Sequence, residues 1–325
     1  MTLDASVVGA RIVVRHETGG TGPSGGPEMT DVIGRVLVVD DASVTIERRD
    51  GQKVEVAFSA IVTWKRVPDR PLRRRRAASV DPDELTRITS RGWPAIESVP
   101  LGDWELRASA GFTGRANSVA VHGSPGIAFD QALAQVRAFY DERASRPLVQ
   151  VVDGSDEQRA FRSAGWVPMR GYRDGAVVQV ADLEPGWSID PGARVAERAS
   201  DDWLSKYGRL RDEDVAAALA VMEGPAVVGF IAFGEPAVAI GRVVVTGEWA
   251  GLSAVEVDPA HRRQGLARRV VETSLAWAVE HGADKAYLQT MRDNTAALAL
   301  YQPYGFVDHH DYRYLEPGDT SPAQS

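Results

Sequence analysis

The sequence contains no cysteine. This excludes disulfide bonds, thiolate metal sites and a cysteine nucleophile. It also lacks an apolar run of the roughly 18–20 residues that a membrane-spanning helix needs. The best candidate, residues 226–233, has the length of a strand and contains Gly229. The N-terminus, Met1 to Asp4, has neither the basic nor the apolar segment of a signal peptide. We therefore expect a cytoplasmic protein that does not cross a membrane.

Basic charge is in deficit, because 37 Lys and Arg residues stand against 45 Asp and Glu residues. With a net charge of −8, the chain as a whole is not built to bind nucleic acid. The six histidines show no metal-ligand spacing. His309 and His310 are adjacent, and neighbours in a strand point to opposite faces. We therefore predict no metal site.

The remaining composition is that of a soluble globular protein, with 325 residues, 44% hydrophobic and 25% charged. That length suits two or three domains. We predict a mixed α/β (α+β) chain in five segments: a small β-barrel over residues 1–68, a basic linker over 69–80, two mixed α/β regions over 81–184 and 193–315, and a flexible tail over 316–325.

Residues 1–68 consist of short alternating segments separated by turn signals. The Gly/Pro/Ser-rich residues 18–27 predict a mobile loop, and Asp50-Gly51 predicts a hairpin. Five short strands in one small segment suggest a closed barrel, and the pattern resembles an SH3-like barrel. We expect the strands over residues 11–15, 31–39, 43–47, 53–58 and 62–67.

Four consecutive arginines, Arg73 to Arg76, make the following linker basic. Arginine runs attract phosphate. The simplest interpretation is a solvated hinge, and a contact to nucleic acid or to an acidic partner stays open as the alternative.

Helical periodicity and turn signals predict alternating helices and strands in both mixed regions. In the first, we expect helices over 82–90, 129–143 and 155–164, and strands over 104–108, 117–121, 147–152 and 177–180. In the second, we expect strands over 194–197, 227–233, 240–246, 252–257, 285–290 and from 306 onward, and helices over 201–207, 212–222, 265–280 and 294–301.

The most informative stretch is the strand, loop and helix over residues 254–268. A loop that opens a helix directs several unpaired backbone N–H groups toward one point, and the helix dipole adds positive potential there. Gly265 and Ala267 keep bulky side chains away from that point, while Arg262, Arg263 and Arg268 add positive charge. This arrangement is typical of a pyrophosphate cradle.

Arg262, Gly265 and Ala267 match the signature of the Gcn5-related N-acetyltransferase (GNAT) superfamily, which is Gln or Arg, two residues, Gly, one residue, then Gly or Ala. The chain resembles this superfamily again at Asn294 and Tyr301, which are followed by Tyr304-Gly305-Phe306. The resemblance implies a C-terminal GNAT fold that binds acetyl-CoA as co-substrate. It also implies coenzyme contacts from Asn294, from the strand residues Val255, Glu256 and Val257, and from the loop and helix residues Arg262, Arg263, Gln264, Gly265, Leu266, Ala267 and Arg268.

The resemblance further implies the reaction. A neutral amine attacks the acetyl carbonyl directly, without an acyl-enzyme, and Tyr301 protonates the departing thiolate. A phenol suits this role because it is protonated at neutral pH and is a hydrogen-bond donor.

No residue is assigned as the general base. Some relatives have a glutamate five positions before the asparagine, where this chain has Gln289, and others use a strand position that corresponds to Gly251. An amide cannot act as a base. Glu248 and Glu256 are nearby acids, and loss of the amine proton to water is the remaining alternative.

Residues 81–184 follow a similar order of elements but lack an Arg-x-x-Gly-x-Ala loop. The chain therefore resembles tandem GNAT proteins in which one half is degenerate, and it is more similar to actinobacterial GNAT proteins with an SH3-like front domain, often labelled histone acetyltransferase-like. The unusual residues 111–118 predict a tight turn or, alternatively, a contact to substrate or to the C-terminal half.

Two questions of function stay open at this point. The acceptor is an amine of unknown identity, either a small molecule or a protein lysine. The alternative to an enzyme is a non-catalytic acetyl-CoA-binding regulatory protein that contacts nucleic acid or a protein partner through the barrel and the arginine linker.

Overall fold

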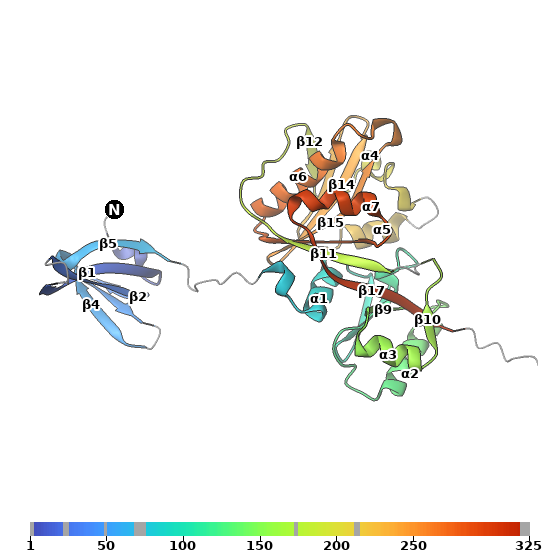
Figure 1. Ribbon diagram of the computed structural model, residues 1–325, viewed down its shortest axis with the longest axis horizontal. Helices are drawn as coiled ribbons and strands as arrows, with labels where there is room; N and C mark the ends of the chain where they lie inside the picture. The colour runs from blue at the N-terminus through green and yellow to red at the C-terminus, as the bar shows by residue number, and fades with distance from the viewer. Residues whose placement is uncertain are drawn as a thin grey trace, which may run out of the picture. The chain divides into compact units, whose positions relative to one another are not determined.

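The computed structural model describes residues 3–21, 26–48, 51–67, 76–171, 175–210 and 215–318. The chain divides into two compact units, Met1–Arg75 and Arg76–Ser325 (Figure 1). Five predicted features lie partly outside the described residues. The parts concerned are loop residues 22–25, the hairpin residue Asp50, linker residues up to Arg75, helix residues 212–214 and tail residues 319–325.

The N-terminal unit is a five-stranded antiparallel sheet in the order β4-β3-β2-β1-β5. Ile12 and Val14 from β1 and Val32 and Val36 from β2 are buried in its core. The predicted strands are confirmed, but β1 and β2 extend into the segment predicted as a loop, because they pair with each other as far as Thr21 and Pro27. The strands are β1 (Arg11–Thr21), β2 (Pro27–Val39), β3 (Ser43–Glu47), β4 (Lys53–Ala57) and β5 (Ile61–Arg66).

The second unit alternates helices and strands, as the sequence predicts. Its first part contains α1 (Pro82–Gly92), β6 (Glu97–Leu101), β7 (Trp104–Ala108), β8 (Val119–Ala120), α2 (Phe129–Asp141), β9 (Val149–Val152), α3 (Asp156–Ser163), β10 (Trp166–Pro168) and β11 (Ala176–Asp182). Its second part contains β12 (Ala193–Ala196), α4 (Asp201–Leu204), α5 (Val215–Met222), β13 (Val228–Phe233), β14 (Ala239–Thr246), β15 (Trp249–Val257), α6 (Leu266–Glu280), β16 (Lys285–Met291), α7 (Thr295–Tyr301) and β17 (Val307–Pro317).

All twelve of these strands join one sheet, in the order β12-β13-β14-β15-β16-β11-β17-β9-β8-β7-β6, with β10 paired to β17. Strand β11 comes from the first part of the chain but lies between β16 and β17 of the second part. It pairs with β16 from Ala176↔Met291 to Asp182↔Lys285. The first and second parts therefore exchange strands and share one continuous sheet, which Figure 1 shows passing between them.

Helices cover both faces of the sheet around β14 and β15. Helix α6 packs on one face, with Leu266, Val270 and Val271 buried on its inner side, as predicted. Helix α1 packs on β14 and β15 in a separate core that contains Trp249 and Tyr287. Because side chains alternate along a strand, successive residues of β15 and β16 face different cores.

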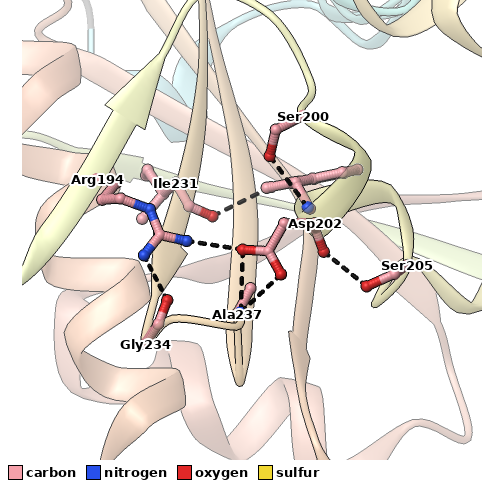
Figure 2. Close-up of polar contacts among 8 residues, drawn as sticks. Arg194, Ser200, Asp202, Ser205, Ile231, Gly234 and Ala237 are labelled. Carbon is pink, nitrogen blue, oxygen red and sulfur yellow. Dashed lines mark hydrogen bonds and ion pairs between the residues drawn. The ribbon is translucent and has the colours of Figure 1, made fainter.

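A polar network fixes the short helix α4 to the sheet (Figure 2). Both oxygens of Asp202 accept from the backbone N–H of Ala237, at 2.8 and 3.0 Å, and Arg194 donates to Asp202 at 2.8 Å. The Trp203 indole donates to the carbonyl of Ile231 at 3.1 Å. The chain that follows lies beside β15, because the Tyr207 ring packs on Trp203 at 5.4 Å and the N–H of Gly208 donates to Glu256 at 3.1 Å.

Some local predictions need correction. Strands β6 and β10 were not expected, and β8 is limited to Val119–Ala120. The alternation expected at His309 and His310 fails, because the pairing of β11 with β17 shifts register between Val178 and Gln179. The bulge brings the two imidazoles together, with Nδ1 atoms 2.7 Å apart.

Candidate active site

A wedge opens in the sheet where β15 and β16 separate. The two strands pair in parallel only from Trp249↔Lys285 to Leu252↔Leu288, although β15 continues to Val257 and β16 to Met291. Just beyond the last pair, Ala254 adopts a positive φ of 53° and the register between β14 and β15 shifts. Such a bulge turns a strand away from its neighbour. The backbone of β15 between Ala254 and Val257 is thereby separated from β16.

The loop after β15 is shaped by its own side chains and by glycine. Asp258 accepts from the N–H of Ala260 at 3.0 Å and pairs with Lys206 at 2.9 Å. Gly265 lies in the left-handed region, with φ 80°, and forms the N-cap of α6. A Cβ atom at Gly265 would meet no atom within 4 Å. The glycine is therefore required by backbone conformation and not by crowding within the chain.

The first turn of α6 suits an anion. It has no acidic residue and no side-chain cap, so its N–H groups are not neutralised by the chain. Arg262 and Arg263 precede it, and Arg268 lies within it.

A cleft of about 690 Å³ joins the wedge, the loop and α7. It brings together the predicted site residues with the exception of Gln264, which does not line it. Sequence reasoning missed four further lining residues, for which no motif position gave a signal: His261, Ala296, Ala297 and Leu300. The predicted lining residues are Val255, Glu256, Val257, Arg262, Arg263, Gly265, Leu266, Ala267, Arg268, Asn294 and Tyr301.

Helix α7 carries the two residues of the second motif. Asn294 is its N-cap, and the side-chain oxygen accepts from the N–H of Ala297 at 3.1 Å. Tyr301 ends the helix, is 6% exposed and packs on Phe306 at 5.4 Å between ring centroids. Burial raises the pKa of the Tyr301 phenol. Among the described residues its hydroxyl has no hydrogen-bond partner, so the proton is available to a ligand in the cleft.

The acids considered as bases lie in different places. Glu248 pairs with Lys285 at 2.7 Å, at the start of the β15–β16 pairing. Glu256 lines the cleft, and its Oε2 accepts from the N–H of Gly208 at 3.1 Å. Glu256 also lines a second cleft of about 450 Å³ on the side of Tyr207 and Leu210. It therefore stands on the wall between the two clefts.

Gly251 has no room for an acid in this fold. A Cβ at that position would lie 2.4 Å from the hydroxyl of Tyr287. The same hydroxyl would lie 2.0 Å from a Cβ at Gly92 in α1. Burial raises the pKa of Tyr287 to about 12, so the phenol stays neutral between these two glycines.

Two broader features bear on function. No helix in the described parts of the chain is both long and apolar enough to span a membrane. The described residues also hold no group of three or more acidic or histidine side chains placed to bind a metal ion.

The chain is similar to proteins of known family along most of its length. Residues 83–315 match the family model "Probable histone acetyltransferase Rv0428c C-terminal", and residues 6–65 match "Rv0428c N-terminal Sm-like domain". The small antiparallel domain is thus described as Sm-like, where the sequence suggested an SH3-like barrel.

Comparison with individual proteins supports the same family assignment. The "Probable histone acetyltransferase Rv0428c" of Mycobacterium tuberculosis is 29% identical over 98% of this chain and 96% of its own length. The "Uncharacterized N-acetyltransferase YobR" of Bacillus subtilis is 26% identical over 71% of this chain and 97% of its own. A solved "GCN5-related N-acetyltransferase from Kribbella flavida" shares the fold with a TM-score of 0.52 and 16% identity, over 74% of this chain and 96% of that one.

The predicted N-acetyltransferase class is therefore confirmed, and the family implies acetyl-CoA as the acetyl donor. The chain belongs to the GNAT N-acetyltransferase family, in the group of Rv0428c-like proteins with an N-terminal Sm-like domain.

Proposed function

We propose that the 690 Å³ cleft binds acetyl-CoA and that the acetyl group passes directly to an amine. One observation carries this proposal: a glycine-capped helix N-terminus without acids lines the same cleft as a buried tyrosine whose hydroxyl bonds to no other described residue. The pyrophosphate would accept hydrogen bonds from the N–H groups around Gly265 and attract Arg262, Arg263 and Arg268. The separated backbone of Val255 and Val257 would pair with the amides of the pantetheine arm.

The proposed step balances as one acyl transfer. The amine nitrogen attacks the acetyl carbonyl carbon, the carbon–sulfur bond breaks, and the Tyr301 hydroxyl donates its proton to the departing thiolate. The amine loses a proton to the Glu256 carboxylate, directly or through water. Glu256 is favoured over Glu248 because Glu256 lines the cleft and Glu248 does not.

The middle part of the chain is proposed not to bind acetyl-CoA. We propose that residues 81–184 are a degenerate GNAT-like half and that residues 193–315 are the acetyltransferase domain. The Sm-like domain, predicted as an SH3-like barrel, occupies residues 1–68. A basic linker over 69–80 follows it, and residues 316–325 form a tail. On this proposal acetyl-CoA binds only at the C-terminal half, and the protein acts in the cytoplasm.

The decisive experiment compares substitutions at two glycines that both have a left-handed backbone conformation. Gly265→Val places a branched side chain at φ 80° and should abolish acetyl-CoA binding in calorimetry and thiol release with an amine panel. Gly165→Val imposes the same strain at φ 83° outside the cleft, where a Cβ also meets nothing within 4 Å. It should keep wild-type affinity. Equal affinities of the two variants would refute the site.

The alternative function has one observation in its favour. Gln289 replaces the glutamate expected from some relatives, which fits a protein that binds acetyl-CoA without turnover. Binding in calorimetry with no thiol release on any amine would favour this regulatory protein. A salt-dependent shift of nucleic acid that disappears on deletion of residues 73–76 would support its partner role.

A further inference from the structure

The loop that follows β7 in the middle part is held in an unusual conformation. Ala110 and Thr113 have positive φ angles of 48° and 59°, which a β-branched residue such as threonine rarely adopts. The Asn117 side chain ties the loop together. Its oxygen accepts from the N–H groups of Ser109 and Gly111, and its nitrogen donates to the carbonyls of Phe112 and Thr113. Strained loops that the surrounding structure holds this firmly cluster at functional sites.

This loop presents one charged side chain, Arg115, to the C-terminal half. The guanidinium lies over the ring of Trp93, 4.4 Å from the centroid. Trp93 is itself fixed, because its indole donates to Thr113 at 3.0 Å and stacks on Phe112 at 5.9 Å. Nη1 of Arg115 donates to Oε1 of Gln289 at 2.8 Å. Arg115 is thus held at one end of β16 by two independent contacts.

Gln289 stands at the wedge. It follows Leu288, the last residue of β16 that pairs with β15. Leu288 belongs to the core under α6, so alternation places Gln289 on the other face of the sheet, toward α1 and the middle part. Arg115 therefore reaches the wedge from the face opposite α6, where an acceptor can approach a thioester held between β15 and β16.

In the described parts of the chain, no side chain neutralises the charge of Arg115. An amide oxygen orients a guanidinium but carries no compensating charge, whereas a glutamate at position 289 would form an ion pair. No carboxylate contacts Arg115 among the described residues. Arg242 also lies over Trp93, at 4.9 Å, and donates to the carbonyls of Met222 and Gly92. A half-buried cation without a counter-charge, beside a second buried one, favours an anionic ligand.

We propose that Arg115, positioned by Gln289 and Trp93, determines acceptor specificity by binding a carboxylate on the amine substrate. This inference rests on the proposed acetyl transfer at the same wedge. A planar guanidinium with free N–H groups matches a carboxylate in two parallel hydrogen bonds. The acceptor class is then a small amino acid, whose amine faces the thioester while its carboxylate meets Arg115. A lysine within a polypeptide has no free carboxylate near its amine.

The test uses the full-length protein and matched pairs of acceptors. Each standard L-amino acid, together with β-alanine and 4-aminobutyrate, is compared with its own amide by thiol release. For the acceptors that react, kcat/KM should be at least about tenfold higher for the acid than for the amide. Arg115→Gln should bring that ratio close to one. Gln289→Glu keeps the arginine but supplies a competing carboxylate, and should also lower the ratio.

A control and a second readout separate the outcomes. Arg137→Gln removes an exposed positive charge from α2 and should leave the acid-to-amide ratio and the affinity for acetyl-CoA unchanged. Calorimetry with saturating CoA should show the same preference for acids in binding, without any turnover. Acetylation of acids and amides at equal rates, unchanged by Arg115→Gln, would overturn this inference and leave the acetyl transfer standing. If acetyl-CoA binds but no amine reacts, the proposed reaction is wrong. The role of Arg115 is then tested by calorimetry alone: a higher affinity for acids than for amides that is lost in Arg115→Gln supports it, and equal affinities refute it.

Discussion

The middle and the C-terminal parts of the large sheet repeat one order of elements. In each, two strands pair in parallel, β8 with β9 and β15 with β16. A long helix, α2 or α6, connects the two strands, and a shorter helix, α3 or α7, follows the second. Each shorter helix leads into a left-handed glycine, Gly165 or Gly305. The two parts therefore differ less in architecture than their sequences suggest.

A buried arginine also recurs in both parts. Arg107 on β7 donates to Ser118 at 3.0 Å, and Arg242 on β14 donates to Ser253 at 3.4 Å. Each then reaches the end of α1, at Ser90 or at Gly92. The shared polar contacts support the proposed tandem arrangement, with α1 between the two parts.

The differences lie at the positions that bear chemistry. The second residue of α2 is Asp130, and the second residue of α6 is Ala267. Four residues before the left-handed glycine, the middle part has Phe161 and the C-terminal part has Tyr301. An acid at a helix N-terminus repels an anion, and a phenylalanine has no proton to donate. Of the two parts, only the C-terminal one therefore has the residues of the proposed anion site and the proposed proton donor.

The space around Phe161 is also filled. Its ring lies 5.4 Å from Trp104, 5.1 Å from Phe129 and 5.1 Å from Trp166. In the C-terminal part, the corresponding region is lined by small side chains such as Ala296 and Ala297, and a cleft remains. Aromatic packing stabilises one part where the other leaves room for a ligand.

The largest effect is expected when Tyr301 is replaced by the residue type found at the matching position of the middle part. Tyr301→Phe gives the C-terminal part the residue type of the middle part, and removes only the hydroxyl. Turnover should fall by about a hundredfold or more, since positioned general acids contribute on that scale, while calorimetric affinity for acetyl-CoA stays within about twofold. Steady-state kinetics with the best amine of the panel measures it.

Tyr304→Phe is the matched control. That hydroxyl donates to Glu272 at 3.0 Å and does not line the cleft. Turnover of this variant should remain near wild type. If both tyrosine variants keep full turnover, water or another side chain protonates the thiolate.

The local half of this comparison could be read from the sequence. The loop at Gly265 and the helix at Asn294 are short motifs whose spacing fixes their own geometry. Eleven of the fifteen residues that line the cleft were therefore predicted, and of the predicted residues only Gln264 lies outside it. Helix α6 was predicted to within one residue for the same reason, because its periodicity and its stop at His281 are local.

Features that depend on contacts between residues far apart in the sequence could not be predicted from it. The insertion of β11 between β16 and β17 is set by contacts across the whole unit. The sequence left a contact from residues 111–118 to the C-terminal half open as an alternative but gave no partner for it, because the bond from Arg115 to Gln289 joins residues 174 positions apart. Gly251 looked like a missing acid, whereas its role is to make room for Tyr287. These features follow from tertiary packing, which the spacing of residues within a motif does not predict.

A smaller effect is expected from moving the acid of α2 into α6. Ala267→Asp places a carboxylate at the same helix position as Asp130, next to the proposed pyrophosphate. Affinity for acetyl-CoA should fall about tenfold relative to Ala267→Asn, which has nearly the same size and no charge. The difference should shrink as salt is raised, because screening weakens the repulsion. Equal losses for Asp and Asn would mean that size, not charge, sets the requirement at this position.

The last prediction concerns the acid stability of β17, the strand that joins the two parts by pairing with both β11 and β9. Burial, and then the neighbouring His309, lower the pKa of His310 from 6.5 to about 4. A lowered histidine pKa means that the folded state favours the neutral ring. The contribution to stability is therefore complete above about pH 6.5 and is lost as pH falls toward 4, by about 2 kcal/mol at pH 4.5.

His310→Gln removes this titration while keeping a polar side chain on β17. Between pH 7 and pH 4.5, the free energy of unfolding should therefore fall less in the variant than in the wild type, by about 2 kcal/mol. Urea denaturation at both pH values measures the difference, and other acidic groups cancel because they are common to both proteins. His309 interacts with the carbonyl of Val80 at 2.8 Å through Nε2 and with His310 through its other ring nitrogen, so the pair is held from the side of α1. Parallel pH profiles for the two proteins would show that His310 titrates normally and that the strand shared by both parts is not sensitive to acid at this point.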